Sequence, residues 1–210
     1  SSDLNHHWFS RTNPPIYWIN FQRFNDHLLK LLTFPKNCYM ARLTYIQDKI
    51  VSIEEAQKRI ALFQLKNEAV VFTNGCFDVL HLGHVTYLAA AADLGKRLMV
   101  AINTDDSVRR LGKAPNRPIN DTHARATLIA ALGFVDLVIA FDEDTPLEAI
   151  RTLKPDVLVK GADYDQNEVN PLKPGYIVGS DIVRENGGIV QTIDFVHGYS
   201  TTEILKKGAQ

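Results

Sequence analysis

The sequence predicts an α/β fold, a Rossmann-like doubly wound sheet of five parallel strands with helices on both faces. Three observations support this prediction: five short apolar segments, helical periodicity between successive segments, and short connecting loops. Parallel strands need crossover connections, which are right-handed and place helices on the faces of the sheet. Apolar runs without alternation are typical of strands buried on both faces.

The expected elements follow one another regularly. Ser52 followed by Glu55 forms a capping box, which begins a helix that ends near Leu65. We expect strands at residues 69–72, 97–103, 135–141, 156–161 and 188–193. We expect further helices at residues 84–95, 104–112, 121–133, 144–153, 180–188 and 200–208. Gly95 should cap the end of the helix at 84–95, and Pro146 should lie in the first turn of the helix at 144–153.

The first 39 residues differ in composition from the rest of the chain. They contain both tryptophans and almost no acidic residues. We therefore expect an atypical N-terminal extension at residues 1–39, a helical segment at 40–66 and the α/β domain at 67–210. Within the extension, apolar residues from Phe21 to Leu32 predict a short amphipathic helix. The extension is interpreted either as sequence upstream of a natural start at Met40 or as a dimerisation arm.

Composition limits the classes of partner. The net charge is −1, so no strongly basic surface for nucleic acid is expected. No apolar run reaches the ~20 residues that a membrane-spanning helix needs. Cys38 and Cys76 provide no disulfide framework, which favours a reducing compartment, and the N-terminal residues lack a secretory signal pattern. We expect a cytoplasmic protein that binds neither nucleic acid nor a membrane.

Polar residues follow four of the expected strands. In open parallel sheets, ligands bind beyond the carboxyl ends of the strands. The candidate segments therefore lie at 73–84, 103–105, 160–164 and 194–202. The four segments should meet at one edge of the sheet.

His81 and His84 lie at the start of the helix that follows the first strand. Three interpretations are open: a zinc site with Cys76 and Asp78, a structural pair in which one histidine caps the helix, or a turn that surrounds a phosphate chain. The last is favoured because glycines let the backbone approach a ligand and a helix N-terminus offers free N–H groups. The segment lacks the P-loop and dinucleotide-binding patterns.

The segment TNGCFDVLHLGH (73–84) resembles the signature of cytidylyltransferase-type nucleotidyltransferases, in which an HxGH motif lies between the first strand and helix. The resemblance extends to NTDDSVRRL, NRPIN, EDTPLEAI, KPDVLVKGADY, GYIVGSDIVRENGG and GYSTTEILKKG. Together these segments resemble the heptose 1-phosphate adenylyltransferases from about residue 50 to the C-terminus. The resemblance implies transfer of the adenylyl group of ATP, with Mg²⁺, to a heptose 1-phosphate. The products would be pyrophosphate and ADP-heptose for lipopolysaccharide core or related glycans.

The resemblance also implies roles for individual residues. His81 and His84 would be catalytic donors to the triphosphate, and Lys160 would neutralise a phosphate. The remaining nucleotide- and phosphate-binding candidates are Thr73, Asn74, Gly75, Phe77, Asp78, Gly83, Asn103, Asp105, Gly161, Asp163, Ser200, Thr201 and Thr202. Candidates for contacts with substrate phosphates are Lys113, Arg117 and Arg125. No protein-bound structural metal is expected.

Several of these candidates have a second interpretation. Asp78 either orients a histidine or the nucleotide, or it stabilises a local Asx-type turn. Ser200 and Glu203 form a capping box, so this turn either only caps the last helix or also binds phosphate. Asp105 could meet the ribose, the sugar or Mg²⁺.

Other activities also remain open. One alternative is a cytidylyltransferase for glycerol 3-phosphate or a similar alcohol phosphate, or an FAD-forming adenylyltransferase. These relatives usually have an arginine in the turn before the last helix, where this chain reads GYSTTEIL. A second alternative is a non-catalytic nucleotide-binding scaffold module. The resemblance further implies a homodimer and a separate heptose kinase that supplies the substrate.

Overall fold

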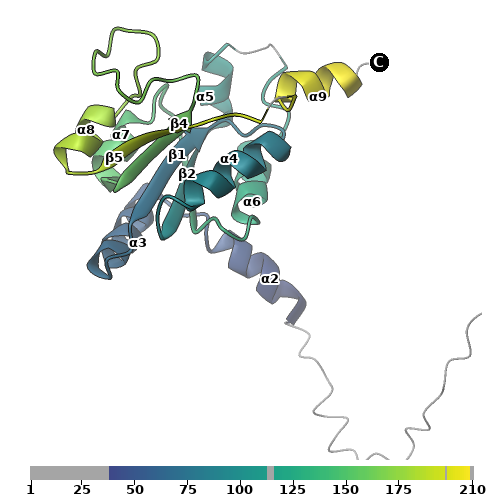
Figure 1. Cartoon of the computed structure of the whole chain (residues 1–210). Helices are drawn as coiled ribbons and strands as arrows, with labels where there is room; N and C mark the ends of the chain where they lie inside the picture. Colours follow the sequence, from purple (N-terminus) through teal and green to yellow (C-terminus); the bar gives the residue numbers. More distant parts are fainter. Residues whose placement is uncertain (1–37, 113–115, 197, 209–210) are drawn as a thin grey trace, which may run out of the picture. The chain divides into compact units, whose positions relative to one another are not determined.

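A computed structural model describes residues 38–112, 116–196 and 198–208. The chain divides into two compact units, residues 1–40 and 41–210, and the second unit contains the sheet. Figure 1 shows this unit as a sheet between two layers of helices. The helix expected at Phe21–Leu32 lies outside the described residues.

Five parallel strands form the sheet, in the order β3-β2-β1-β4-β5. The strands are β1 (Val70–Gly75), β2 (Arg97–Asn103), β3 (Leu137–Phe141), β4 (Val157–Gly161) and β5 (Ile189–Ile193). The chain moves outward from β1 to β3 and then crosses to the other side of β1, so the strand order reverses between β1 and β4. This topology confirms the predicted doubly wound fold.

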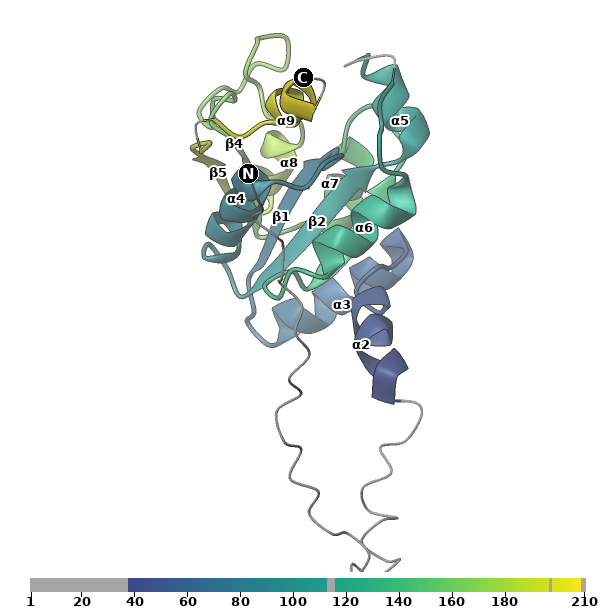
Figure 2. The ribbon, with the colours of Figure 1, turned by 90° about the vertical axis from the view of Figure 1, so that its right-hand side faces the viewer.

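Helices cover both faces of the sheet. Their bounds are α2 (Cys38–Gln47), α3 (Ile53–Leu65), α4 (Leu82–Ala92), α5 (Asp105–Arg110), α6 (Thr122–Ala130), α7 (Leu147–Leu153), α8 (Ser180–Glu185) and α9 (Thr201–Gly208). Figure 2 shows α4 and α6 in front of β1 and β2. The helices α3, α7 and α8 pack on the opposite face, where they share a core with the sheet.

Alternating strand residues supply the two cores. In β1, Phe72 joins the core under α3, α7 and α8, whereas Val71 joins the core under α4 and α6. Both side chains are 0% exposed. In β4, Leu158 and Val159 divide between the two cores in the same way. Strands with apolar residues on both faces therefore have no solvent side, as their sequence predicts.

Local capping signals are confirmed at several helices. The Ser52 hydroxyl accepts a hydrogen bond from the Glu55 N–H at 3.3 Å, as expected for the capping box. Thr104 and Asp121 cap α5 and α6 in the same manner. Ala56 and Ile60 of α3 are buried in the core against the sheet, so the segment predicted as 40–66 packs directly on the α/β domain.

Two expectations about helix ends were wrong. The C-cap of α4 is Asp93 rather than Gly95. Gly95 is required for a different reason, because a Cβ there would lie 2.6 Å from Val71 Cγ2. Helix α7 begins at Leu147 with Pro146 at the N-cap, and Asp144 instead pairs with Arg110 at 2.8 Å. For helix α2 only a helical segment at 40–66 was expected, without bounds for this helix, because its residues show weak amphipathic periodicity.

Candidate active site

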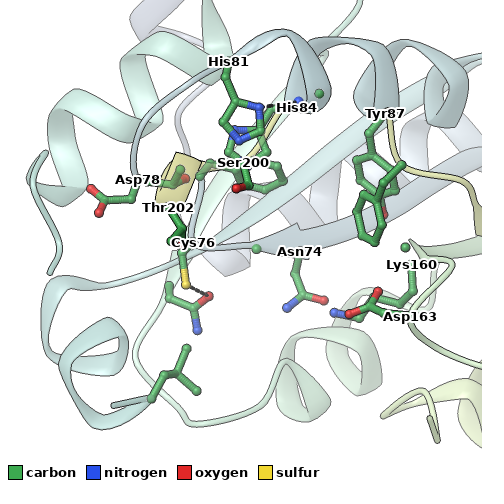
Figure 3. A pocket seen from close by; sticks show the side chains of 18 of the residues that line it. Asn74, Cys76, Asp78, His81, His84, Tyr87, Lys160, Asp163, Ser200 and Thr202 are labelled. Atoms are coloured by element: carbon green, nitrogen blue, oxygen red, sulfur yellow. Dashed lines mark hydrogen bonds between the residues drawn. The ribbon is translucent and has the colours of Figure 1, made fainter. Parts of the chain in front are cut away.

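A cavity of about 800 Å³ opens at the carboxyl ends of β1 and β4, where the strand order reverses. All four candidate segments contribute to its lining, which confirms that they meet at one edge. Figure 3 shows the histidines from α4 and residues from β1, β4 and the start of α9 around it. The predicted residues in the lining are Asn74, Gly75, Phe77, Asp78, His81, Gly83, His84, Asn103, Arg117, Lys160, Gly161, Asp163, Ser200, Thr201 and Thr202.

The two histidines of the HxGH motif are stacked at the start of α4. Their ring centroids are 3.7 Å apart, with an interplanar angle of 18°. His81 is the N-cap residue, and its Nδ1 accepts a hydrogen bond from the His84 N–H at 3.3 Å. Burial lowers the pKa of His81. A neutral ring whose Nδ1 is an acceptor carries its proton on Nε2, so His81 retains one N–H donor.

Gly83 allows the chain to close around this pair. A Cβ at this position would lie 3.1 Å from His81 Nδ1 and 3.2 Å from the Tyr199 carbonyl oxygen. Only glycine therefore lets the loop before α9 approach the first turn of α4 without displacement. The capping interpretation of His81 is confirmed, and it is compatible with a binding role because the capped histidine also lines the cavity.

The loop after β1 is shaped by Phe77 and Asp78. Phe77 adopts a left-handed backbone conformation with φ of 47°, and its ring packs edge-on against His84 at 5.1 Å. Asp78 is 2% exposed, and its Oδ1 accepts hydrogen bonds from the N–H groups of Ile119 (2.7 Å) and Asn120 (3.0 Å). Asp78 therefore ties this loop to a segment about 40 residues away, and these bonds are not those of a local Asx-type turn.

Arg117 belongs to that tied segment. Its Nε lies 3.7 Å from Asp78 Oδ2, and its side chain is 12% exposed while it lines the cavity. The carboxylate of Asp78 therefore orients a cation at the cavity wall. This placement is compatible with the predicted contact between Arg117 and a substrate phosphate, which stays a prediction.

Arg125 does not face the cavity, contrary to its expected contact with substrate. It is 0% exposed, and its guanidinium donates to five protein acceptors. These acceptors are the carbonyl oxygens of Cys76, Asn103 and Asn120, Asp105 Oδ1 and Thr122 Oγ1. An arginine has only five N–H donors, so none is left for a phosphate. Arg125 instead fixes the ends of β1 and β2.

Two other described candidates, Asp105 and Thr73, are not part of the cavity lining. Burial alone would raise the pKa of Asp105, but hydrogen bonds from Arg125 and Thr122 lower it. The Asp105 carboxylate accepts both of these hydrogen bonds at Oδ1. Thr73 is fully buried, and its hydroxyl bonds to the Tyr87 hydroxyl at 2.7 Å. Lys113 lies outside the described residues.

Several residues of the lining were not predicted. Tyr87 lies one helical turn after His84, a spacing that could have indicated it, and burial raises its pKa to about 12. Cys76 also lines the cavity, and its thiol contacts Asn103 Oδ1 at 3.7 Å. Phe195 and Tyr199 reach the site from the loop between β5 and α9. The candidate segment 194–202 contains both, but no pattern within it distinguished them.

The ends of β4 and α9 complete the cavity. Lys160 Nζ lies 5.1 Å from the centroid of the Tyr164 ring. A Cβ at Gly161 would lie 2.0 Å from Phe195 Cζ, so glycine is required where β4 meets this aromatic residue. Ser200 Oγ accepts a hydrogen bond from the Glu203 N–H at 3.2 Å, as the capping box predicts.

The described residues show neither a metal cluster nor a membrane span. Within them, no group of three or more His, Cys, Asp or Glu side chains is arranged to hold a metal ion. The zinc interpretation of the histidine pair therefore has no support from the described part of the chain. None of the described helices is long and apolar enough to cross a membrane.

Comparison with known proteins agrees with this geometry. The family model described as cytidylyltransferase-like matches residues 72–207, which include every cavity segment. The bifunctional protein HldE of Gluconobacter oxydans is 52% identical over 157 residues, which cover 75% of this chain and 31% of that protein. HldE of Campylobacter concisus is 54% identical over 161 residues, covering 77% and 31%. This chain thus spans about a third of the length of these relatives.

Solved structures also resemble this chain. The lipopolysaccharide core biosynthesis protein from Thermoplasma volcanium shares 30% sequence identity, with 61% of this chain and 97% of that chain covered and a TM-score of 0.46. The family assignment rests on the sequence match over residues 72–207 and on the site that these residues build. The chain belongs to the cytidylyltransferase-like family.

Proposed function

We propose that this protein transfers the adenylyl group of ATP to a heptose 1-phosphate, giving ADP-heptose and pyrophosphate for lipopolysaccharide core or related glycan synthesis. The 52% identity to HldE over 157 residues carries this proposal, and the family match over residues 72–207 includes every segment of the cavity. The geometry supports a phosphoryl-type transfer. Paired imidazoles at a helix N-terminus, a lysine and a hydroxyl-rich turn surround one cavity and are suited to a polyanion.

The reaction that we propose needs positioning and charge neutralisation more than a base. An oxygen of the sugar phosphate is already ionised at neutral pH and attacks the α-phosphorus of ATP. A new P–O bond forms while the bond to the bridging oxygen of pyrophosphate breaks, and pyrophosphate leaves with that electron pair. His81 and His84 would donate N–H groups to the oxygens that gain charge, and Lys160 and Arg117 would hold the two phosphates together.

Mg²⁺ would enter this site with ATP. Mg²⁺ is commonly held by substrate phosphates and only one or two carboxylates, which suits a cavity whose described residues form no cluster of three acidic or histidine ligands. Bound to the triphosphate, the ion would supply further charge neutralisation. We also propose that the protein acts in the cytoplasm as a homodimer, on heptose 1-phosphate supplied by a heptose kinase.

A pyrophosphate-release assay tests the proposed function. ATP or CTP would be supplied with a panel of heptose, hexose and glycerol phosphates, and His84→Ala would be the control. We expect release with ATP and a heptose 1-phosphate, and a loss of ~100-fold or more in the variant. Release only with CTP and glycerol 3-phosphate would favour the cytidylyltransferase alternative. No release with any pair, or undiminished release by His84→Ala, would contradict the proposal.

A further inference from the structure

The cavity has two chemically different sides, which correspond to the two faces of the sheet. Side chains alternate along a strand, so residues two apart lie on the same face. Phe72 and Leu158 belong to the core under α3, α7 and α8, which places Asn74 and Lys160 on that same face at the ends of β1 and β4. Tyr87 and the histidines project from α4 on the opposite face.

Aromatic rings pack together on the α4 side of the cavity. Tyr87 and Phe195 lie 6.3 Å apart between ring centroids, and Phe77 packs against His84. Flat apolar rings and the helix N-terminus suit a nucleotide base and its phosphates. The side that carries Asn74 and Lys160 also carries Asn103, and Lys160 lies there over the Tyr164 ring.

Asn74 has an unsatisfied acceptor on its side of the cavity. Its Oδ1 is buried and has no hydrogen-bond partner among the described residues. Both polar atoms of the neighbouring Asn103 amide have protein partners: Oδ1 contacts the Cys76 thiol, and Nδ2 donates to Ser107 Oγ at 2.9 Å. A buried acceptor without a partner is costly and uncommon in folded proteins. Asn74 lines the cavity, so a bound ligand can supply the missing donor.

The chemistry of this atom selects the kind of ligand group. An amide oxygen only accepts hydrogen bonds, and an ionised phosphate has no donor to give it. The partner must therefore be an O–H or N–H group. Sugar hydroxyls both donate and accept, which matches a surface where the acceptor of Asn74 lies next to the ammonium of Lys160 on the neighbouring strand (Figure 3).

We infer that Asn74 Oδ1 accepts a hydrogen bond from a hydroxyl of the sugar phosphate, and that the side of the cavity carrying Asn74 and Lys160 is the acceptor-sugar subsite. This inference rests on the proposed function and assigns Asn74 to the sugar rather than to the nucleotide or a phosphate. It makes Asn74 a specificity-determining residue. The nucleotide then occupies the α4 side of the cavity.

Kinetics of two variants test the subsite. Asn74→Ala removes the amide, and Asn74→Leu removes it while keeping a similar volume. At saturating ATP, kcat/KM for heptose 1-phosphate should fall ~10- to 100-fold in both, because a site built to bind a hydroxyl loses one hydrogen bond. The KM for ATP, and the affinity for α,β-methylene ATP measured by calorimetry, should change less than ~3-fold.

Monodeoxy analogues of heptose 1-phosphate identify the contact directly. Wild type should discriminate against at least one analogue that lacks a single hydroxyl, and the Asn74 variants should not. Asn186→Ala, in an exposed asparagine at the end of α8, is the matched control and should retain wild-type discrimination. Thermal melting of all variants checks that they are folded.

The outcomes separate this inference from the proposed function. If wild type is active and the Asn74 variants match it for the sugar, the inference is wrong and the proposed function stands. An equal or larger effect on ATP binding would place the missing donor on the nucleotide and would also overturn the inference. If wild type releases no pyrophosphate with any sugar 1-phosphate, both are wrong.

Discussion

Arg125→Ala should be strongly destabilising, because it removes a buried charge that organises the edge of the sheet. The guanidinium is 0% exposed and bonds to three backbone carbonyls, one carboxylate and one hydroxyl. Breaking a buried ion pair by removing one partner typically costs ~3–5 kcal/mol. Its partner Asp105 is 27% exposed and can be rehydrated. We therefore expect a loss near the middle of that range, about 4 kcal/mol.

Thermal melting followed by circular dichroism measures this loss. For a domain of this size, 1 kcal/mol lowers the Tm by ~2–4 °C, so the Tm should fall by about 8–16 °C. Arg125→Lys keeps the charge but concentrates its donors on one atom, which cannot reach the carbonyls of Cys76, Asn103 and Asn120 together. Its loss should be about half as large, with fewer acceptors left unpaired.

Arg109→Ala is the matched control for these variants. It removes the same charge from an exposed helix, where Arg109 pairs with Asp106 three residues earlier and is 60% exposed. Surface pairs contribute ~0–1 kcal/mol, so its Tm should change by at most about 4 °C. If Arg125→Ala also melts within about 4 °C of wild type, the reasoning about the buried network is refuted.

Four further variants, at three positions, test the site around α4. His81→Asn keeps a good N-cap but loses the Nε2–H donor. Its Tm should stay close to that of wild type, while its rate of pyrophosphate release should fall ~100- to 1000-fold. His81→Ala should in addition lose ~1 kcal/mol of stability, because it removes the cap. Burial lowers the pKa of His81 from 6.5, so the unfolded chain takes up this proton at a higher pH than the folded protein does. The free energy of unfolding of wild type should therefore decrease as pH falls below 6.5. Urea titrations of His81→Asn should lack this part of the decrease. Tyr87 has a pKa raised to about 12, so stability should decrease as pH rises from 10 towards 12, a step that denaturation of Tyr87→Phe should not show. Gly83→Ala places a Cβ 3.1 Å from His81 Nδ1. Turnover should fall by ~10-fold or more, because the histidine is displaced. Unchanged kinetics would show that the loop before α9 moves aside without affecting the site.

Local signals made much of the fold predictable. Apolar strand segments and capping boxes involve residues within a few positions of one another, so the sequence displays them directly. The bounds of β2 and the cap at Ser52 agree with prediction for this reason. The bounds of helix α2 were not predicted because its apolar residues do not form a clear stripe, and Leu43 and Tyr45 remain exposed in the structure.

The direction of individual side chains was less predictable. Arg125 lies just after the start of α6, near the carboxyl ends of the strands, which made it a reasonable candidate for a substrate contact. Its orientation depends on carbonyls at the ends of two different strands, up to 49 residues away. Asp78 was ambiguous for the same reason, because its acceptor oxygen is used by the N–H groups of Ile119 and Asn120.

The sequence by itself determined the fold class, the positions of the strands and the segments that meet at the carboxyl edge of the sheet. These properties follow from periodicity and from the rule that parallel strands end at one edge. Only the tertiary structure decided which polar side chains face the cavity. It turned Arg125 and Thr73 inward and left the amide oxygen of Asn74 without a protein partner. The physical reason is that hydrogen bonds between distant segments compete for each polar group, and that competition is resolved only when the sheet and its helices pack together.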